Sequence, residues 1–131
     1  HRPNRRQRQM CIRDSEKGDG DMVDENKVIL THYAVYFEDG NLLDTSILEV
    51  AEKFNMFDNR RAQAGGYSPI EAKVGAKDMM IQGFKEGLKL LKTGDKATLF
   101  LPYYLAYGET ESRGIPAKSN LIFEVEIVDQ K

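Results

Sequence analysis

The chain has 131 residues, of which 40% are hydrophobic and 31% charged, and its formal net charge is −2. This length suits one domain with a tail and is enough to bury an ordinary core without disulfides or a structural metal. The composition is that of a globular protein: no apolar run approaches the roughly 18 residues of a membrane span, and the single Cys11 excludes a disulfide framework.

Residues 1–14 differ from the rest of the chain. They show no apolar period, and several arginines stand among polar residues, at Arg2, Arg5, Arg6, Arg8 and Arg13. We expect a disordered basic tail, and one alternative is an arm that attracts phosphate. A third interpretation is that the segment is not biological, because residues 10–15 resemble the translation of a transposon-end adapter used in sequencing libraries. On that interpretation the remaining chain is more acidic, which argues against a nucleic-acid partner.

The segment 15–26 is acidic and contains glycine, with little to bury, and we expect a linker there before a folded domain at 27–131. Residues 28–37 are rich in aliphatic and aromatic side chains. Asp39 and Gly40 then precede a second apolar stretch, which predicts a β-hairpin because glycine accepts a positive φ without strain.

Apolar residues next recur at helical spacing with charged residues between them, at Ile47, Val50, Ala51 and Phe54. This pattern predicts an amphipathic helix, which the hydroxyl of Thr45 or Ser46 is placed to cap. Gly65 and Gly66 end the helical region, so we expect a helical insertion over residues 47–68.

The rest of the chain predicts three more strands and one main helix. Residues 70–74, 96–101 and 121–127 have the alternation or apolar content of strands. After the first of them, apolar residues recur along one helix face, at Ile81, Phe84, Leu88 and Leu91. A single main helix among antiparallel strands predicts an α+β fold, with a curved antiparallel sheet wrapped on that helix.

The most specific feature lies between the last two predicted strands. Residues 101–108 read LPYYLAYG, with three tyrosines before a glycine turn, and Gly-Ile-Pro follows at 114–116. Three earlier segments complete an ordered set, at 28–33, 43–46 and 80–88. This order and spacing resemble the FK506-binding-protein (FKBP) family of peptidyl-prolyl cis/trans isomerases, in its bacterial form, and the resemblance covers roughly residues 26–131.

The resemblance implies an isomerase that assists protein folding by acting on proline-containing polypeptides in an apolar, aromatic pocket. By position, the catalytic residues of the family correspond to Tyr107, Asp44 and Phe84. The substrate-binding residues correspond to Tyr33, Leu43, Ile70, Met80, Ile81, Ile115 and Phe123. In the family picture the Phe84 ring is the pocket floor, the Tyr107 hydroxyl donates to a substrate carbonyl, and Asp44 orients a neighbouring hydroxyl. Phe84 and Asp44 have plainer alternatives: a helical Phe often packs in the core, and an Asp can end a strand or make a turn.

Some positions depart from the family pattern. Well-known members carry Trp at the position of Phe84, and Phe at the positions of Leu43 and Ile70, so we expect a roomier pocket with weakened affinity for macrolide inhibitors. The basic residue that often pairs with the pocket Asp has no clear counterpart, because the insertion occupies its place. Arg60 and Arg61 are the candidates.

Other chemistries find no support in the sequence. The histidines are His1 and His32, too isolated to predict a metal site or a catalytic triad, and we expect His32 to be a packed or hydrogen-bonded strand residue. Rotation about an X-Pro amide breaks no bond and needs no nucleophile, metal or cofactor.

Two functional hypotheses remain. The first is an active isomerase, and the second is a non-catalytic chaperone or protein-binding module of the same fold. The compartment stays open between the cytoplasm and the bacterial envelope, because the natural N-terminus is expected to be missing. We expect a monomer.

Overall fold

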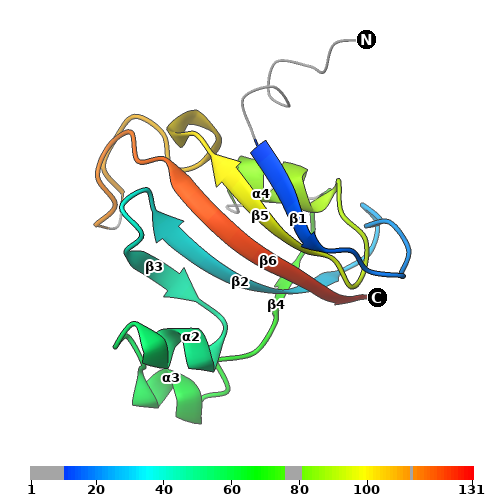
Figure 1. Ribbon diagram of the computed structural model, residues 1–131, viewed down its shortest axis with the longest axis horizontal. Coiled ribbons are helices and arrows are strands. Elements are labelled where there is room, and N and C mark those ends of the chain that lie inside the picture. The colour runs from blue at the N-terminus through cyan, green and yellow to red at the C-terminus, as the bar shows by residue number, and fades with distance from the viewer. Residues whose placement is uncertain (1–10, 76–80, 113) are drawn as a thin grey trace.

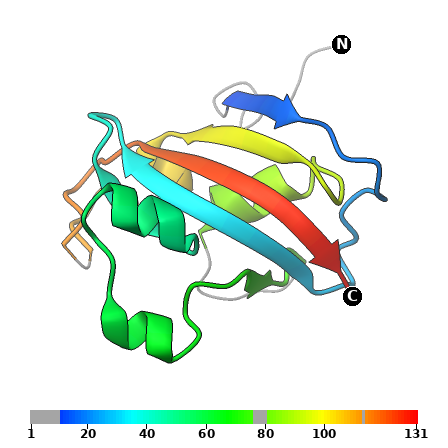
Figure 2. The same cartoon turned by 60° about the horizontal axis from the view of Figure 1, so that its bottom comes forward.

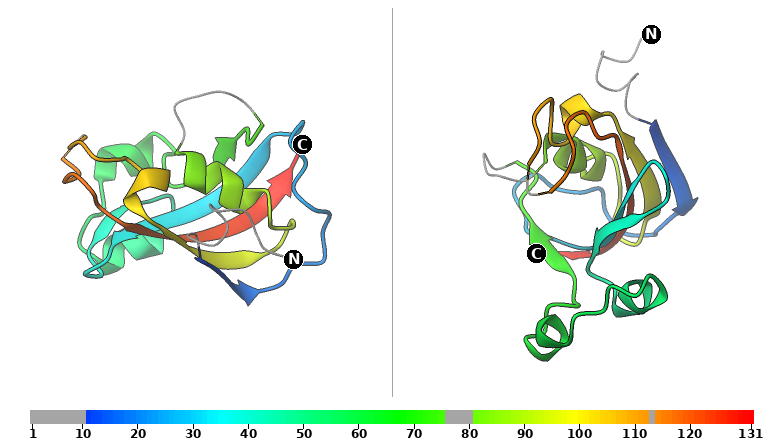
Figure 3. Two further views of the ribbon diagram at one scale, coloured as in Figure 1. Left: turned by 90° about the horizontal axis from the view of Figure 1, so that it is seen from above. Right: turned by 90° about the vertical axis from the view of Figure 1, so that its left-hand side faces the viewer.

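The computed structural model describes residues 11–75, 81–112 and 114–131. In these residues six strands form one antiparallel sheet in the order β1-β5-β6-β2-β3, and β4 also pairs with β2 (Figure 1). The strands are β1 Cys11–Glu16, β2 Ile29–Phe37, β3 Leu42–Thr45, β4 Ile70–Ala72, β5 Lys96–Leu101 and β6 Leu121–Gln130. Helix α4, Gln82–Leu88, lies along one face of the sheet (Figure 3). The predicted α+β fold is therefore confirmed.

The centre of the sheet is the long pairing of β2 with β6, which runs from Phe37 opposite Leu121 to Ile29 opposite Gln130. Alternate residues of β6 point to the helix side and are buried, namely Leu121, Phe123, Val125 and Ile127. The same alternation in the sequence predicted this strand, because successive side chains of a strand point to opposite faces. The buried face of the sheet and the apolar side of α4 together form the core.

Helix α4 packs closely on the core. Phe84 and Leu88 are buried on its inner side, and Leu91 is buried just after its end. Gly83 and Gly87 lie on the same inner side and are also buried. A Cβ at Gly87 would meet the Leu99 side chain of β5 at 2.6 Å, and one at Gly83 would meet the backbone oxygen of Leu105 at 2.7 Å, so these residues allow the helix to pack closely on the sheet and on the loop after it.

The predicted insertion consists of two short helices, α2 at Leu48–Lys53 and α3 at Asn59–Gln63. Strands β3 and β4 pair with the same edge of β2, and the insertion leaves the sheet after β3 and returns at β4 (Figure 2). It is anchored in part by the Phe54 ring, which packs against Tyr36 with the ring centres 5.7 Å apart.

The predicted cap of the first insertion helix is wrong. The residue before α2 is Ile47, and α2 has no side-chain cap. The Ser46 hydroxyl instead accepts a hydrogen bond from the backbone N–H of Tyr33 at 2.8 Å, and the Thr45 hydroxyl accepts one from the backbone N–H of Ile47 at 3.0 Å. The Thr45 hydroxyl also donates to the carbonyl of Tyr33 at 2.7 Å, so both hydroxyls contact the Tyr33 backbone on β2 and neither caps α2.

The prediction of a disordered tail over residues 1–14 is wrong from Cys11 onward, and residues 1–10 lie outside the described residues. Strand β1 pairs with β5, from Cys11 opposite Phe100 to Glu16 opposite Lys96. Most side chains of β1 are exposed. An edge strand is held by main-chain hydrogen bonds, which every residue except proline can donate, so the polar composition of this segment did not reveal the strand.

The segment predicted as a linker, 15–26, is also ordered by contacts with the loop before β5. Its backbone exchanges hydrogen bonds with that loop, as in Gly20 N–H to Thr93 at 3.1 Å and Val23 N–H to Leu91 at 3.0 Å. Val23 joins the core cluster. The segment is therefore part of the domain, because its backbone groups find partners in the loop.

None of the helices in the described ranges is long and apolar enough to cross a membrane.

Candidate functional site

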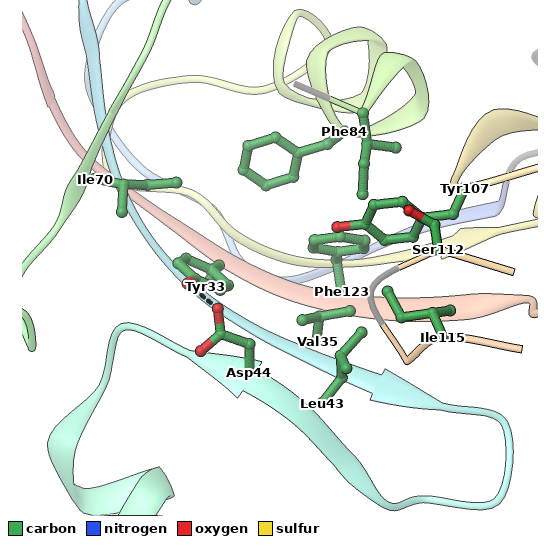
Figure 4. Close-up of a pocket in the computed structure, with 11 residues that line it drawn as sticks. Tyr33, Val35, Leu43, Asp44, Ile70, Phe84, Tyr107, Ser112, Ile115 and Phe123 are labelled. Carbon is green, nitrogen blue, oxygen red and sulfur yellow. Dashed lines mark hydrogen bonds between the residues drawn. The ribbon is translucent and has the colours of Figure 1, made fainter. Parts of the chain in front are cut away.

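A hollow of about 540 Å³ opens between the sheet, α4 and the loop that follows β5 (Figure 4). This volume lies within the range of about 300–1,000 Å³ that is usual for ligand sites. The residues that line it are Tyr33, Val35, Leu43, Asp44, Ile70, Ile81, Phe84, Tyr107, Ser112, Ile115 and Phe123. They come from β2, β3, β4, α4, β6 and that loop, with Ile81 directly before α4.

Every site residue predicted from the sequence and described by the structure lines this hollow. The remaining predicted residue, Met80, lies outside the described residues. The prediction missed two lining residues. Val35 could have been found, because it lies two positions after Tyr33 and therefore on the same face of β2. Ser112 lies in an irregular loop and carries no comparable signal in the sequence.

The deep part of the hollow is aromatic. The rings of Phe84 on α4 and Phe123 on β6 pack with their centres 5.2 Å apart, tilted by 42°. These side chains are only 3% and 5% exposed, so the floor of the hollow belongs to the hydrophobic core. Any group that enters reaches an apolar environment with little water.

The rim beside β3 is polar and charged. The Tyr33 hydroxyl donates a hydrogen bond of 2.6 Å to one oxygen of Asp44, and Arg61 Nη1 donates one of 2.7 Å to the other. Arg61 lies on α3 and also donates from Nε to the carbonyl of Gly66 at 3.2 Å. Of the two arginines that the sequence left as candidates, Arg61 is therefore the partner of Asp44.

Burial, the hydrogen bond to Asp44 and the charge of Asp44 together raise the pKa of Tyr33 to about 12, so its hydroxyl stays protonated. Burial disfavours the charge of Arg61, but hydrogen bonds to Asp44 and Tyr33 outweigh it, and the pKa of the guanidinium is raised. At neutral pH the rim thus holds the Arg61 cation and the neutral Tyr33 hydroxyl, and both contact Asp44.

The opposite wall comes from the loop after β5. The short helix η1, Tyr103–Leu105, precedes Tyr107, and the backbone N–H of Gly108 returns to the carbonyl of Tyr103 at 2.8 Å. Gly108 has a φ of +86°, which glycine adopts without strain and which turns the chain after Tyr107. Figure 4 shows the Tyr107 ring near Phe123 with its hydroxyl directed into the hollow. Tyr107 is 37% exposed, so this hydroxyl is reachable from solvent.

His32 has the plain structural role that the sequence predicted. It is half-buried on β2, and its Nδ1 lies 3.0 Å from the hydroxyl of Ser46. Within the described part of the chain, no group of three or more His, Cys, Asp or Glu side chains is arranged to hold a metal ion.

Comparison with known families matches residues 20–128 to the family described as FKBP-type peptidyl-prolyl cis-trans isomerase. The chain belongs to this family. The match begins inside the segment 15–26, which agrees with the contacts that make that segment part of the domain.

Named relatives and a solved structure agree with this membership. FkpA of Buchnera aphidicola, an FKBP-type isomerase by name, is 36% identical over 114 residues, which are 87% of this chain and 38% of that protein. FK506-binding protein 2 of Debaryomyces hansenii is 34% identical over 102 residues, 78% of this chain and 62% of that protein. The crystal structure of FkpA from Escherichia coli superposes with a TM-score of 0.70 at 28% identity, covering 93% of this chain and 48% of that one.

The chain thus spans about two fifths of the length of the Buchnera FkpA proteins that it matches.

Proposed function

We propose that this FKBP domain catalyses cis/trans isomerisation of peptide bonds that precede proline in polypeptide chains, without a cofactor. The observation that carries the proposal is the meeting of Phe84, Phe123, Tyr33 and Tyr107 around one hollow of about 540 Å³, in a chain that belongs to this family. The hollow is large enough for a proline and its neighbours, and its floor is apolar.

The chemistry of the reaction fits an apolar site. Rotation about the X-Pro amide costs its resonance and takes tens to hundreds of seconds without a catalyst, but no bond breaks. The twisted amide has less charge separation than the planar one, so a site with little water favours it relative to the ground state. A difference of ~4 kcal/mol between the two would accelerate rotation roughly a thousandfold.

The proposed roles follow from the positions of the side chains. The rings of Phe84 and Phe123 contact the proline ring at the floor, and the Tyr107 hydroxyl donates to a carbonyl of the bound peptide. Asp44 holds the Tyr33 hydroxyl and so fixes the ring that makes one wall. Substrate contacts are completed by Leu43, Ile70, Ile81, Ile115 and, from its position in the sequence alone, Met80.

The test is the rate of cis/trans exchange in a short Ala-Pro peptide, measured by exchange NMR with and without the protein. We expect clear acceleration, and Tyr107→Phe should lower kcat/KM modestly because one hydrogen bond to the substrate is lost. If the protein leaves the exchange rate unchanged in a series of peptides with different residues before proline, the proposed isomerase function is wrong.

A second candidate is a module that binds polypeptides without catalysis. Exposed Met56 and Phe57 on the insertion favour it, since large apolar side chains at a surface are typical of contact with other chains. The same NMR experiment separates the two candidates. A pure binding module would shift the peptide resonances on binding and leave the exchange rate as it is in water.

We also propose that macrolide inhibitors bind weakly, because Leu43 and Ile70 offer less aromatic surface than the Phe residues of well-known members. Calorimetric titration with FK506 would show an affinity in the nanomolar range if this proposal is wrong.

A further inference from the structure

The charged rim of the pocket includes one side chain from the insertion. Arg61 on α3 donates from Nη1 to Asp44 at 2.7 Å, and its Nη2 lies 3.5 Å from the Tyr33 hydroxyl. The side chains of Arg61 and Asp44 are 31% and 45% exposed, so water competes for both groups. A long side chain loses rotamer freedom when it is fixed, and in a partly exposed ion pair this loss offsets much of the attraction. Any group that restrains the guanidinium therefore strengthens the contact.

The ring of Tyr67 restrains it. The guanidinium carbon of Arg61 lies 4.8 Å from the centre of this ring, within the distance at which a cation is attracted to an aromatic face. The Nε of the same group donates to the carbonyl of Gly66, the residue before Tyr67, at 3.2 Å. Arg61 is thus held by hydrogen bonds at its nitrogen atoms and by the ring of Tyr67.

Tyr67 is itself fixed at both its ring and its hydroxyl. The ring stacks on Phe57, with the ring centres 5.7 Å apart and the planes at 13°. The hydroxyl accepts a hydrogen bond of 2.8 Å from the backbone N–H of Asp58, whose side chain caps α3. Tyr67 is half-buried and is not among the residues that line the main pocket. Any effect of Tyr67 on that pocket is therefore transmitted by other residues.

We propose that Tyr67 is a positioning residue for the pocket and acts through Arg61. Its ring restrains the guanidinium, the guanidinium orients Asp44, and Asp44 holds the Tyr33 hydroxyl that fixes one wall. The proposal rests on the proposed isomerase function, since this wall is part of the substrate pocket. It gives the insertion a part in that function, because Arg61 and Tyr67 both lie between β3 and β4.

A second route from Tyr67 to the pocket runs along the chain. Tyr67 lies three residues before Ile70, which is on β4 and lines the main pocket. Loss of the ring would on this route displace the start of β4 and leave the rim as it is. The two routes are separable, because only the first one needs Arg61.

The test is a double-mutant cycle of Tyr67→Leu and Arg61→Gln, with kcat/KM for a short Ala-Pro peptide measured by exchange NMR. We expect each single variant to lower kcat/KM about threefold, the order expected for an exposed contact between a cation and a ring. The double variant should also lose about threefold, because the second change removes a contact that the first has already broken, whereas independent effects would multiply to about ninefold. Tyr67→Phe keeps the ring and should stay near the wild type.

The second readout is the NMR signal of the Arg61 Nε–H group, which is sensitive to the ring current of Tyr67 and to the hydrogen bond with Gly66. We expect Tyr67→Leu to move this signal toward that of a free arginine side chain and to speed its exchange with water. The matched control is Phe54→Leu. Phe54 belongs to the same insertion and packs on another ring, that of Tyr36, and it does not line the main pocket. It should change neither the signal nor kcat/KM.

Three outcomes would overturn the proposal: wild-type kcat/KM in Tyr67→Leu, losses that multiply in the double variant, or an equal loss in Phe54→Leu. Multiplying losses would assign the effect to β4 instead. If the wild type does not accelerate exchange, the isomerase function is wrong, and the Arg61 signal then tests the positioning by itself, since an unchanged signal in Tyr67→Leu would contradict it. Tyr67→Met has no ring either and replaces Tyr67→Leu if that variant does not fold.

Discussion

The carboxylate of Asp44 accepts hydrogen bonds from three segments: the Tyr33 hydroxyl on β2, Arg61 on α3 and the backbone N–H of Thr45. Its side chain is 45% exposed, so water also reaches it. A carboxylate with this many partners is fixed in orientation, and through Tyr33 it fixes one wall of the pocket.

The Tyr33 hydroxyl makes the stability of the fold vary with pH in the alkaline range. Burial, followed by Asp44, raises the pKa of Tyr33 from 10.0 to about 12, so the folded state holds the proton more tightly than the unfolded chain. Its contribution is complete below pH 10 and is lost as pH rises toward 12. We expect the free energy of unfolding, from urea titrations, to fall more steeply over this range in the wild type than in Tyr33→Phe.

Tyr36, whose pKa burial and Glu124 also raise to about 12, is present in both proteins, so the difference between them isolates Tyr33. Parallel stability curves would contradict the assignment.

Arg61→Gln separates a structural from a functional role of the rim. The ion pair with Asp44 is partly exposed on both sides, so its loss should cost less than ~1 kcal/mol of stability. The looser Asp44 should nevertheless lower kcat/KM a few-fold, measured by exchange NMR. Arg61→Lys keeps the charge but not the planar fork and should restore part of the activity. A large loss of stability at unchanged kcat/KM would show that Arg61 serves folding alone.

At the scale of elements, the two glycines of α4 face different neighbours. A Cβ at Gly83 would lie 2.7 Å from the backbone oxygen of Leu105, whereas one at Gly87 would lie 2.6 Å from the end of the Leu99 side chain. The end of a side chain can move aside at a small cost in free energy, whereas moving the backbone costs more. Alanine also favours a helix over glycine by up to ~1 kcal/mol. Thermal unfolding should therefore show Gly83→Ala to be clearly more destabilising than Gly87→Ala, and the reverse order would contradict this account of the packing.

The insertion reaches the pocket without disturbing the sheet. Because β3 and β4 share one edge of β2, the chain between them can be lengthened while both pairings remain. This extra length places α3 where Arg61, 17 residues after Asp44, can contact it. The right-hand view of Figure 3 shows α2 and α3 standing out from the sheet.

At the scale of the whole molecule, β1 completes the sheet at the edge far from the pocket. It pairs with β5, and Ile12 is the β1 residue that packs against the core. We expect removal of residues 1–16 to lower the free energy of unfolding by about 1–3 kcal/mol, the net value of a few hydrogen bonds. Isomerase activity should be unchanged, because β1 lines no part of the pocket. Loss of activity in a truncated protein that still folds would place β1 in the function.

Much of this architecture could be predicted from periodicity. Alternation along β6 and the helical spacing of Phe84 and Leu88 predicted which faces are buried, because those patterns depend on local geometry. Most of the lining residues followed from the ordered motif, including Tyr107 and Ile115 in the loop after β5. Val35 on β2 and Ser112 in that loop lie outside the motif and were missed, although the alternation along β2 indicated Val35.

By itself, the sequence determined the family, the order of the strands and of the main helix from residue 28 onward, and the apolar floor of the pocket. These depend on periods of two and 3.6 residues and on short motifs that any fold of the chain must keep. Only the tertiary structure decided that Arg61 and not Arg60 pairs with Asp44, that β1 is a strand, and that the insertion forms two short helices, α2 and α3. Each of these depends on which groups far apart in the sequence come into contact, and local sequence patterns do not specify such contacts.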